Sequence, residues 1–139
     1  MKIKVKQAFT LVEMMAVVVI IGILAAVIAP KFFRQVDKAT VTRVRQDLES
    51  IKKAVTLYKF DTNRLPEDLR DLVKDPGSTR GWNGPYLENL PEDPWGNEYQ
   101  YTAPGGESRE FDIWSYGRDG TDGGEGADAD VTSWKSDDT

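Results

Sequence analysis

The 139-residue chain contains no cysteine and no histidine. These absences exclude thiol nucleophiles, disulfide bonds, Ser-His-Asp triads and the commonest side-chain ligand of transition metals. Once an amino-terminal apolar segment is set aside, about a hundred residues remain, enough for one small domain and too few for a large catalytic core. Such a domain must be stabilised without disulfides, and a bound metal is one substitute.

Basic residues are scarce in the distal half of the chain. From Glu88 onward there are 14 acidic residues against three basic ones, and the whole chain has a formal net charge of −5. An acidic surface repels nucleic acid and attracts cations or basic partners. We therefore expect no binding of nucleic acid.

Charge is almost absent between Phe9 and Ala29, where Glu13 is the only charged residue. As a helix, this run is long enough to cross roughly 30 Å of hydrocarbon. Three lysines in residues 1–8 precede it and an acidic part follows it, so we expect a cytoplasmic amino end and an exported remainder. A secretory signal peptide has the same order of basic and apolar residues, but it does not explain Glu13, the length of the run or Pro30 directly after it.

Glu13 is costly inside an apolar segment, by about 2.5–3.5 kcal/mol at mid-span on insertion scales. A carboxylate with that cost is expected to have a partner. The simpler alternative is a tolerated charge at the membrane edge, whose side chain reaches the interface.

Apolar residues with helical spacing follow Pro30. They recur at intervals of three and four and predict one buried stripe, made of Val41, Val44, Leu48, Ile51, Val55 and Tyr58. We predict one long helix from Phe9 to about Lys59, loosened or kinked rather than ended at Gly22 and Pro30.

The rest of the chain predicts short elements. Pro66 fits the first turn of a short helix over residues 67–74. Alternating apolar residues predict strands over residues 98–102, 110–116 and 131–134. The predicted fold class is therefore α+β, with a small antiparallel sheet packed against the buried stripe of the long helix.

Acidic residues and glycines are interspersed in the loop of residues 117–130. The loop holds five carboxylates, those of Asp119, Asp122, Glu125, Asp128 and Asp130. Calcium takes about six to eight such hard oxygen ligands, whereas zinc and copper favour nitrogen or sulfur. A solvated acidic loop is the alternative, because the spacing is not that of an EF-hand.

The segment Ala8-Phe9-Thr10-Leu11-Val12-Glu13-Met14-Met15 resembles the processing signature of type IV pilin-like proteins. The resemblance implies that residues 1–8 are a leader, that a prepilin peptidase cuts between Ala8 and Phe9, and that Phe9 becomes the N-methylated first residue. The family usually has Gly before the cut. Ala8 keeps the small size of that position, so we expect processing.

The same resemblance implies a role for Glu13. In the family this carboxylate pairs with the amino group of a neighbouring subunit's first residue, here Phe9, and sets the stagger of adjacent helices. On this hypothesis Glu13 has no partner until the leader is removed. Gly22 and Pro30 match positions where the family's helix loosens within a filament, although simple tolerance of Gly and Pro in a membrane helix explains them equally well.

The distal half is similar to one branch of this family, the major pseudopilins of type II secretion. The motifs that carry the similarity are Gly84-Pro85-Tyr86-Leu87, Asp93-Pro94-Trp95-Gly96-Asn97, Phe111-Asp112-Ile113 and the run from Gly123 to Asp130 with Trp134. The similarity implies a non-enzymatic subunit with a leader (1–8), a transmembrane and assembly helix (9–30) and a periplasmic domain (31–139). Copies would assemble from the bacterial inner membrane into a periplasmic pseudopilus that helps drive folded proteins across the outer membrane.

The implied partners are further copies of the chain, minor pseudopilins, the prepilin peptidase, the inner-membrane assembly platform and membrane lipid. The resemblance also implies one structural calcium ion in the acidic loop. Its ligands would be Asp119, Asp130 and Asp128 with the backbone carbonyl of Tyr116, whereas Asp122 and Glu125 would face solvent.

Other functions stay open at this point. The nearer alternative is a subunit of a true type IV pilus. The farther one is a signal-anchored exported domain that binds calcium or a glycan, or a hydrolase that uses its carboxylates.

Overall fold

The computed structural model describes residues 9–135, without the side chains of residues 32–36. The expected leader, residues 1–8 with Ala8, lies outside the described residues. The chain divides into two compact units, residues 1–36 and residues 37–139. The boundary expected after residue 30 marks a change in composition, whereas the boundary between the units marks a change in packing.

One helix, α1 (Leu11–Thr62), contributes to both units. It continues through Gly22 and Pro30, as predicted. The kink expected at these two residues stays a prediction. The helix begins at Leu11 rather than at Phe9.

The carboxyl end of α1 is fixed by Asn63. This residue has a left-handed φ of 59°, and its N–H donates to the carbonyl of Lys59 at 2.9 Å. Asparagine adopts this conformation more readily than most residues, so the chain leaves the helix there. The helix therefore extends three residues beyond the end predicted at Lys59.

The second unit buries one stripe of α1. The side chains of this stripe are at most 2% exposed and belong to Val44, Leu48, Ile51, Val55 and Tyr58. Residues three and four apart share one face of a helix, which is why the spacing predicted this stripe correctly. Val41, at the start of the predicted stripe, is only partly buried.

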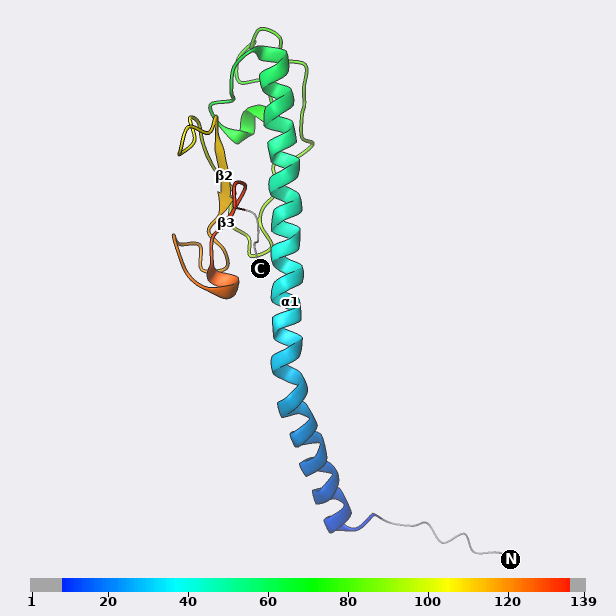
Figure 1. Ribbon diagram of the computed structural model, residues 1–139. Helices are drawn as coiled ribbons and strands as arrows, with labels where there is room; N and C mark the ends of the chain where they lie inside the picture. Colours follow the sequence, from blue (N-terminus) through cyan, green and yellow to red (C-terminus); the bar gives the residue numbers. More distant parts are fainter. Residues whose placement is uncertain (1–8, 136–139) are drawn as a thin grey trace, which may run out of the picture. The chain divides into compact units, whose positions relative to one another are not determined.

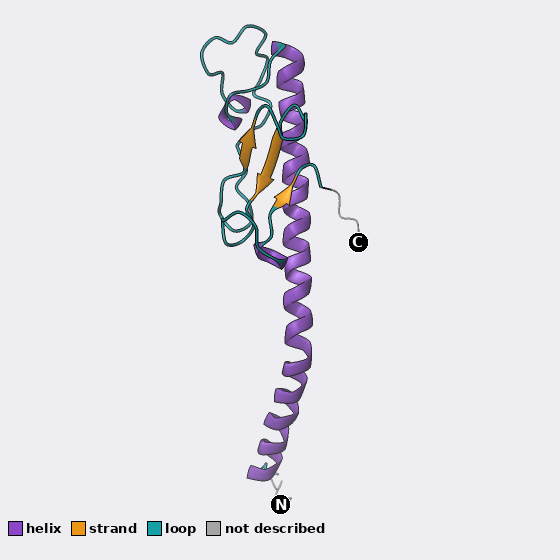
Figure 2. Cartoon of the chain, turned by 60° about the vertical axis from the view of Figure 1, so that its left-hand side comes forward, coloured by secondary structure: helices purple, strands orange, loops and turns teal. Residues whose placement is uncertain are grey.

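A three-stranded antiparallel sheet lies beside this part of α1 (Figures 1 and 2). Its strands, in spatial order, are β1 (Gln100–Thr102), β2 (Asp112–Ser115) and β3 (Val131–Thr132). Trp114 of the central strand pairs with Gln100 on one side and with Thr132 on the other. Each strand lies where the sequence predicted it and is shorter than predicted.

The faces of the sheet differ. Ile113 is fully buried and belongs to the same core cluster as the stripe of α1, whereas Trp114 is only partly buried. Successive residues of a strand point to opposite faces, so Trp114 lies on the face away from the core. The α+β class predicted from the sequence is confirmed by this arrangement.

The segment between α1 and β1 is irregular apart from one short 3₁₀ helix, η1 (Leu69–Leu72), and one isolated antiparallel bridge between Glu92 and Glu98. The carbonyl of Leu72 accepts hydrogen bonds from the N–H groups of Tyr86 (2.7 Å) and Leu87 (3.1 Å). These bonds attach the proline- and glycine-rich segment to the core without a sheet. A second short helix, η2 (Gly126–Asp128), lies in the acidic loop and was not predicted.

Candidate functional site

The described part of the first unit is an apolar helical segment, none of which is buried within the chain. Residues Leu11–Lys31 are long and apolar enough to cross a membrane, and no other helix among the described residues meets that test. Phe9 and Leu11, at its start, are each 78% exposed. A helix that is apolar on all sides is stable only when lipid or other helices cover it. A signal sequence also passes this test, so length and composition alone do not distinguish the alternatives.

Glu13 has hydrogen-bond partners within its own chain. Its Oε2 accepts from the backbone N–H of Thr10 at 2.7 Å and from Thr10 Oγ1 at 2.8 Å. The N–H of Glu13 donates in return to Thr10 Oγ1 at 3.2 Å. This reciprocal arrangement is a capping box, in which side chains satisfy the free N–H groups at the start of a helix. The expectation that Glu13 has no partner before cleavage is therefore wrong.

The capping box explains why α1 begins at Leu11, because Thr10 takes the cap position. It uses only Oε2 of Glu13, and within residues 9–135 no partner of Oε1 is seen. A second partner can therefore bind Glu13 without breaking the cap. The role of Thr10 was not predicted from the sequence, although the pattern Thr-x-x-Glu before an apolar run is the known signal for this motif.

Gly22 and Pro30 lie inside α1. A Cβ atom at Gly22 would meet nothing within 4 Å, so packing within one chain does not require glycine there. Pro30 removes one N–H donor from the hydrogen-bond ladder of the helix. The role of both residues in loosening the helix stays a prediction.

The acidic loop brings together some of its predicted ligands and separates others. Asp130 accepts from the N–H of Gly123 through Oδ2 at 3.2 Å, while its Oδ1 is buried and has no hydrogen-bond partner within the described residues. Asp119 is exposed, and its Oδ1 accepts from the N–H of Thr121 at 3.1 Å. Tyr116 directly follows β2, where the sheet passes into the loop.

Negative charge is concentrated around Asp130. Burial raises the pKa of the Asp130 carboxyl, and the neighbouring carboxyls of Asp122 and Asp119 raise it further. A buried carboxylate oxygen without a donor, next to two more carboxylates, is an environment that a cation would stabilise. Asp122 and Glu125 are both exposed, as expected.

Asp128 is bound elsewhere. Its carboxylate accepts from Nε of Arg118 at 2.8 Å and from Nη2 of Arg118 at 3.1 Å. Within residues 9–135, no three acidic, histidine or cysteine side chains converge in an arrangement that could hold a metal ion. The residues present therefore fit calcium only in part: the Asp119 carboxyl is near enough to raise the pKa of Asp130, whereas Asp128 would first have to leave Arg118.

Two glycines wind the acidic loop tightly around one backbone carbonyl. A Cβ atom would lie 2.7 Å from the carbonyl oxygen of Asp128 at Gly117, and 2.4 Å from it at Gly124. Both glycines have left-handed φ values, 74° and 83°. Only glycine fits at such positions, so the course of the loop is built into the sequence.

The acidic loop is attached to the rest of the domain through Asp93 and Asn97. Asp93 is 4% exposed and accepts from the N–H of Asn97 at 2.8 Å, the N–H of Trp95 at 3.1 Å and Oγ of Ser115 at 2.7 Å. Asn97 Nδ2 then donates to the carbonyl of Gly117 at 3.2 Å, where the loop begins. The sequence motif indicated a family resemblance, but this positioning role was not predicted from it.

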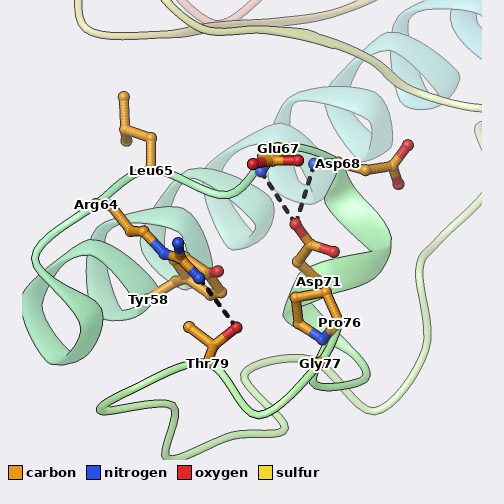
Figure 3. Close-up of a pocket in the computed structure, with 9 residues that line it drawn as sticks. All are labelled: Tyr58, Arg64, Leu65, Glu67, Asp68, Asp71, Pro76, Gly77 and Thr79. Atoms are coloured by element: carbon orange, nitrogen blue, oxygen red, sulfur yellow. Dashed lines mark hydrogen bonds between the residues drawn. The ribbon is translucent and has the colours of Figure 1, made fainter.

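A small pocket of about 270 Å³ lies near the carboxyl end of α1 (Figure 3). Asp71 Oδ2 accepts from the N–H groups of Glu67 (3.0 Å) and Asp68 (3.2 Å), and Arg64 Nη2 donates to Thr79 Oγ1 at 3.1 Å. These bonds join the polar groups of the pocket to the turns beside it. These hydrogen bonds are typical of residues with a structural role, and they do not indicate the acid pair of a hydrolase.

Comparisons with known proteins give two matching family models. The model described as type II secretion system (T2SS), protein G, matches residues 31–134. The model of the prokaryotic N-terminal methylation motif matches residues 3–29. Together the two models cover both the apolar segment and the domain that follows it.

Individual proteins are similar over nearly the whole chain. The type II secretion system core protein G of Pseudomonas aeruginosa is 44% identical over 136 residues, covering 93% of this chain and 95% of that protein. Its counterpart of the same name in Vibrio cholerae is 38% identical over 139 residues, covering 96% and 94%. The crystal structure of the major pseudopilin from the type 2 secretion system of enterohaemorrhagic Escherichia coli has a TM-score of 0.62 and 36% sequence identity, over 72% of this chain and 90% of that one.

Proposed function

Because the chain belongs to the type II secretion system protein G family, the major pseudopilins, we propose that its copies assemble from the bacterial inner membrane into a periplasmic filament. The filament would help drive folded proteins across the outer membrane. The observation that carries this proposal is the segment Leu11–Lys31, of which none is buried within the chain. Lipid can cover this helix before assembly, and neighbouring helices can cover it afterwards.

Processing would come first. The match of the methylation motif to residues 3–29 supports cleavage by a prepilin peptidase between Ala8 and Phe9, followed by N-methylation of Phe9. The processed subunit would then pass from the lipid of the inner membrane to the assembly platform, and minor pseudopilins would share the filament with it. Its carboxyl-terminal domain would face the periplasm.

Glu13 would set the register between neighbouring copies. Its Oε2 is used by the Thr10 cap, and its Oε1 is available for the new ammonium group of a neighbour's Phe9. In an apolar environment this ion pair would neutralise a carboxylate that is otherwise costly. Because every copy carries both groups, each subunit could pair with the next.

We propose a structural role without catalysis. The polar groups of the pocket beside α1 take part in local hydrogen bonds, and the absence of cysteine and histidine removes the common nucleophile and base. In this role the fold must hold its shape while force passes along the filament. The buried Asp93 and the core stripe of α1 serve that purpose.

We propose that the acidic loop holds a structural calcium ion. Asp119 and Asp130 would bind it with the carbonyl of Tyr116, and Asp128 would join them after leaving Arg118. The ion would supply positive charge that offsets the repulsion around Asp130. The buried Oδ1 of Asp130, which has no hydrogen-bond partner within residues 9–135, supports this assignment.

Two experiments test the proposed function. Mass spectrometry of the mature amino terminus should find a peptide that begins with methylated Phe9, whereas a peptide beginning at Met1 or near Pro30 would indicate an anchor or a signal peptide. Deletion of the gene should abolish secretion of exported proteins. If deletion instead removes surface pili and leaves secretion intact, the chain acts in a type IV pilus and the proposal is wrong.

A further inference from the structure

One basic residue, Arg118, lies among the carboxylates of the acidic loop. The sequence of residues 117–130 contains five acidic side chains and no other basic one. The guanidinium of Arg118 donates to both oxygens of the Asp128 carboxylate, through Nε at 2.8 Å and through Nη2 at 3.1 Å. Two parallel hydrogen bonds of this kind are stronger and more specific than a single one. Arg118 is therefore an internal counter-ion of this loop.

The backbone of the loop brings Arg118 to Asp128. The N–H of Arg118 donates to the carbonyl of Ala127 at 2.9 Å, which joins the first residues of the loop to its last turn. The carbonyl of Asp128 is enclosed by Gly117 and Gly124. The side chain of Asp128 is 34% exposed and that of Arg118 is 56% exposed, so packing locks neither of them. The Asp128 carboxylate can therefore change its partner by a rotation of the side chain, while the loop backbone stays in place.

The same carboxylate is among the groups proposed to bind calcium. Arg118 uses both of its oxygens, and a calcium ion would need at least one of them. Two positive groups at one carboxylate also repel each other. A cation that binds through Asp128 must therefore displace Arg118 from this carboxylate.

We propose that Arg118 competes with calcium for the Asp128 carboxylate and thereby sets the affinity of the acidic loop for the ion. Without calcium, Arg118 holds Asp128 and joins the two ends of the loop; with calcium, it no longer does. A contact that is made only in the calcium-free state stabilises that state and weakens apparent binding of the ion. The inference rests on the proposed function, because it concerns the regulation of the calcium site assigned there.

Removal of Arg118 should have two effects of opposite sign. Arg118→Gln leaves Asp128 available to the ion, so calcium should bind about two- to fivefold more tightly, the range expected for the loss of one partly exposed ion pair. In the absence of calcium, the same variant should melt at a lower temperature than the wild type, because the loop loses its internal cation. A purely structural role of Arg118 would lower the melting temperature without tightening the binding of calcium.

Calorimetric titration measures the affinity. The full chain in detergent micelles is freed of divalent cations with EDTA, exchanged into buffer without chelator and titrated with calcium chloride. Tighter binding by Arg118→Gln than by the wild type supports the proposal, whereas equal or weaker binding overturns it. Arg80→Gln makes the same change of charge at an exposed position outside the loop and should bind calcium as the wild type does. An equal gain in affinity from Arg80→Gln would reduce the effect of Arg118 to net charge and would also overturn the proposal.

A double-mutant cycle shows whether Arg118 acts through Asp128. Asp128→Asn keeps the size of the side chain and removes the carboxylate. Arg118→Gln should then tighten calcium binding in the wild-type background and leave the affinity of Asp128→Asn nearly unchanged. Melting temperatures without calcium complete the cycle: Arg118→Gln should lower that of the wild type and not that of Asp128→Asn. Equal effects in both backgrounds contradict a direct competition.

The failure of this inference differs from the failure of the calcium site itself. If neither the wild type nor Arg118→Gln binds calcium, the calcium site of the proposed function is wrong, and the competition is wrong with it. If the wild type binds calcium and Arg118→Gln binds it no better, only the competition is wrong. Binding by Arg118→Gln alone would support the competition, because Arg118 would then exclude the ion from the wild-type chain.

Discussion

The buried carboxylate of Asp93 is expected to hold the distal half of the domain together. Replacement by alanine leaves three donors without an acceptor, namely the N–H groups of Trp95 and Asn97 and the hydroxyl of Ser115. Each unsatisfied donor in a buried site costs about 1–3 kcal/mol. Allowing for relaxation of the loop, we expect Asp93→Ala to lower the free energy of unfolding by about 3–5 kcal/mol.

Thermal unfolding of a fragment comprising residues 31–139, followed by circular dichroism, measures this effect. In a domain of this size, each 1 kcal/mol corresponds to about 4–8 °C, so the melting temperature should fall by at least about 12 °C. Asp93→Asn keeps one carbonyl acceptor, so its free energy of unfolding should fall by only about 1–2 kcal/mol. Ser115→Ala removes one of the three bonds to Asp93 together with the acceptor of the Gly117 N–H, and it should still be less destabilised than Asp93→Ala. A melting temperature of Asp93→Ala close to that of the wild type, or equal losses for Asp93→Ala and Asp93→Asn, would refute the assignment of these bonds as stabilising.

Three further outcomes are expected. Glu13→Ala removes both the hydrogen bonds to Thr10 and the negative charge, whereas Glu13→Gln keeps an acceptor for the helix cap. Both variants should insert into the membrane and be cleaved, but they should assemble poorly. Normal filaments from Glu13→Gln would show that the cap alone suffices. Chelation of calcium should lower the melting temperature of the fragment and Asp119→Ala should abolish this response, while an unchanged melting curve would leave only a solvated acidic loop. The Arg109 guanidinium holds the pKa of the Asp112 carboxyl below its usual range, so stability present above about pH 4 should be lost as the pH falls through the lowered pKa. Asp112→Asn should flatten that acid-side loss in the melting temperature, and an unchanged slope would contradict the assignment.

The helix and its buried stripe could be predicted because both depend on local periodicity. Val44, Leu48 and Ile51 are three or four residues apart, and residues at this spacing lie on one face only in a helix. The strands were also found, but β3 is two residues long and its pairing with β2 depends on contacts that the sequence does not state. The start of α1 was predicted at Phe9, but the hydrogen bonds between Thr10 and Glu13 cap the helix so that it begins at Leu11.

The interactions of the acidic loop could be predicted only in part. Carboxylates and glycines indicated a possible cation site, and the glycines do wind the loop around the carbonyl of Asp128. The pairing of Asp128 with Arg118 was not foreseen, because the two residues are ten positions apart and meet only when the loop folds back. The same holds for Asp93 and Ser115, which are 22 positions apart in the sequence. Such bonds require tertiary structure, which composition and spacing do not give.

The hydrogen bonds at the start of α1 also separate what a cut before Phe9 would change from what it would leave alone. Glu13 accepts from the amide of Thr10, and that amide is the same chemical group in the precursor and in the mature chain. The cut would remove residues 1–8 and turn the nitrogen of Phe9 from a neutral amide into a cation. The acceptor is thus in position throughout the life of the subunit, while its intermolecular donor exists only after proteolysis. An uncut precursor would then be unable to enter a filament early, because Glu13 would lack the cation that is to pair with it.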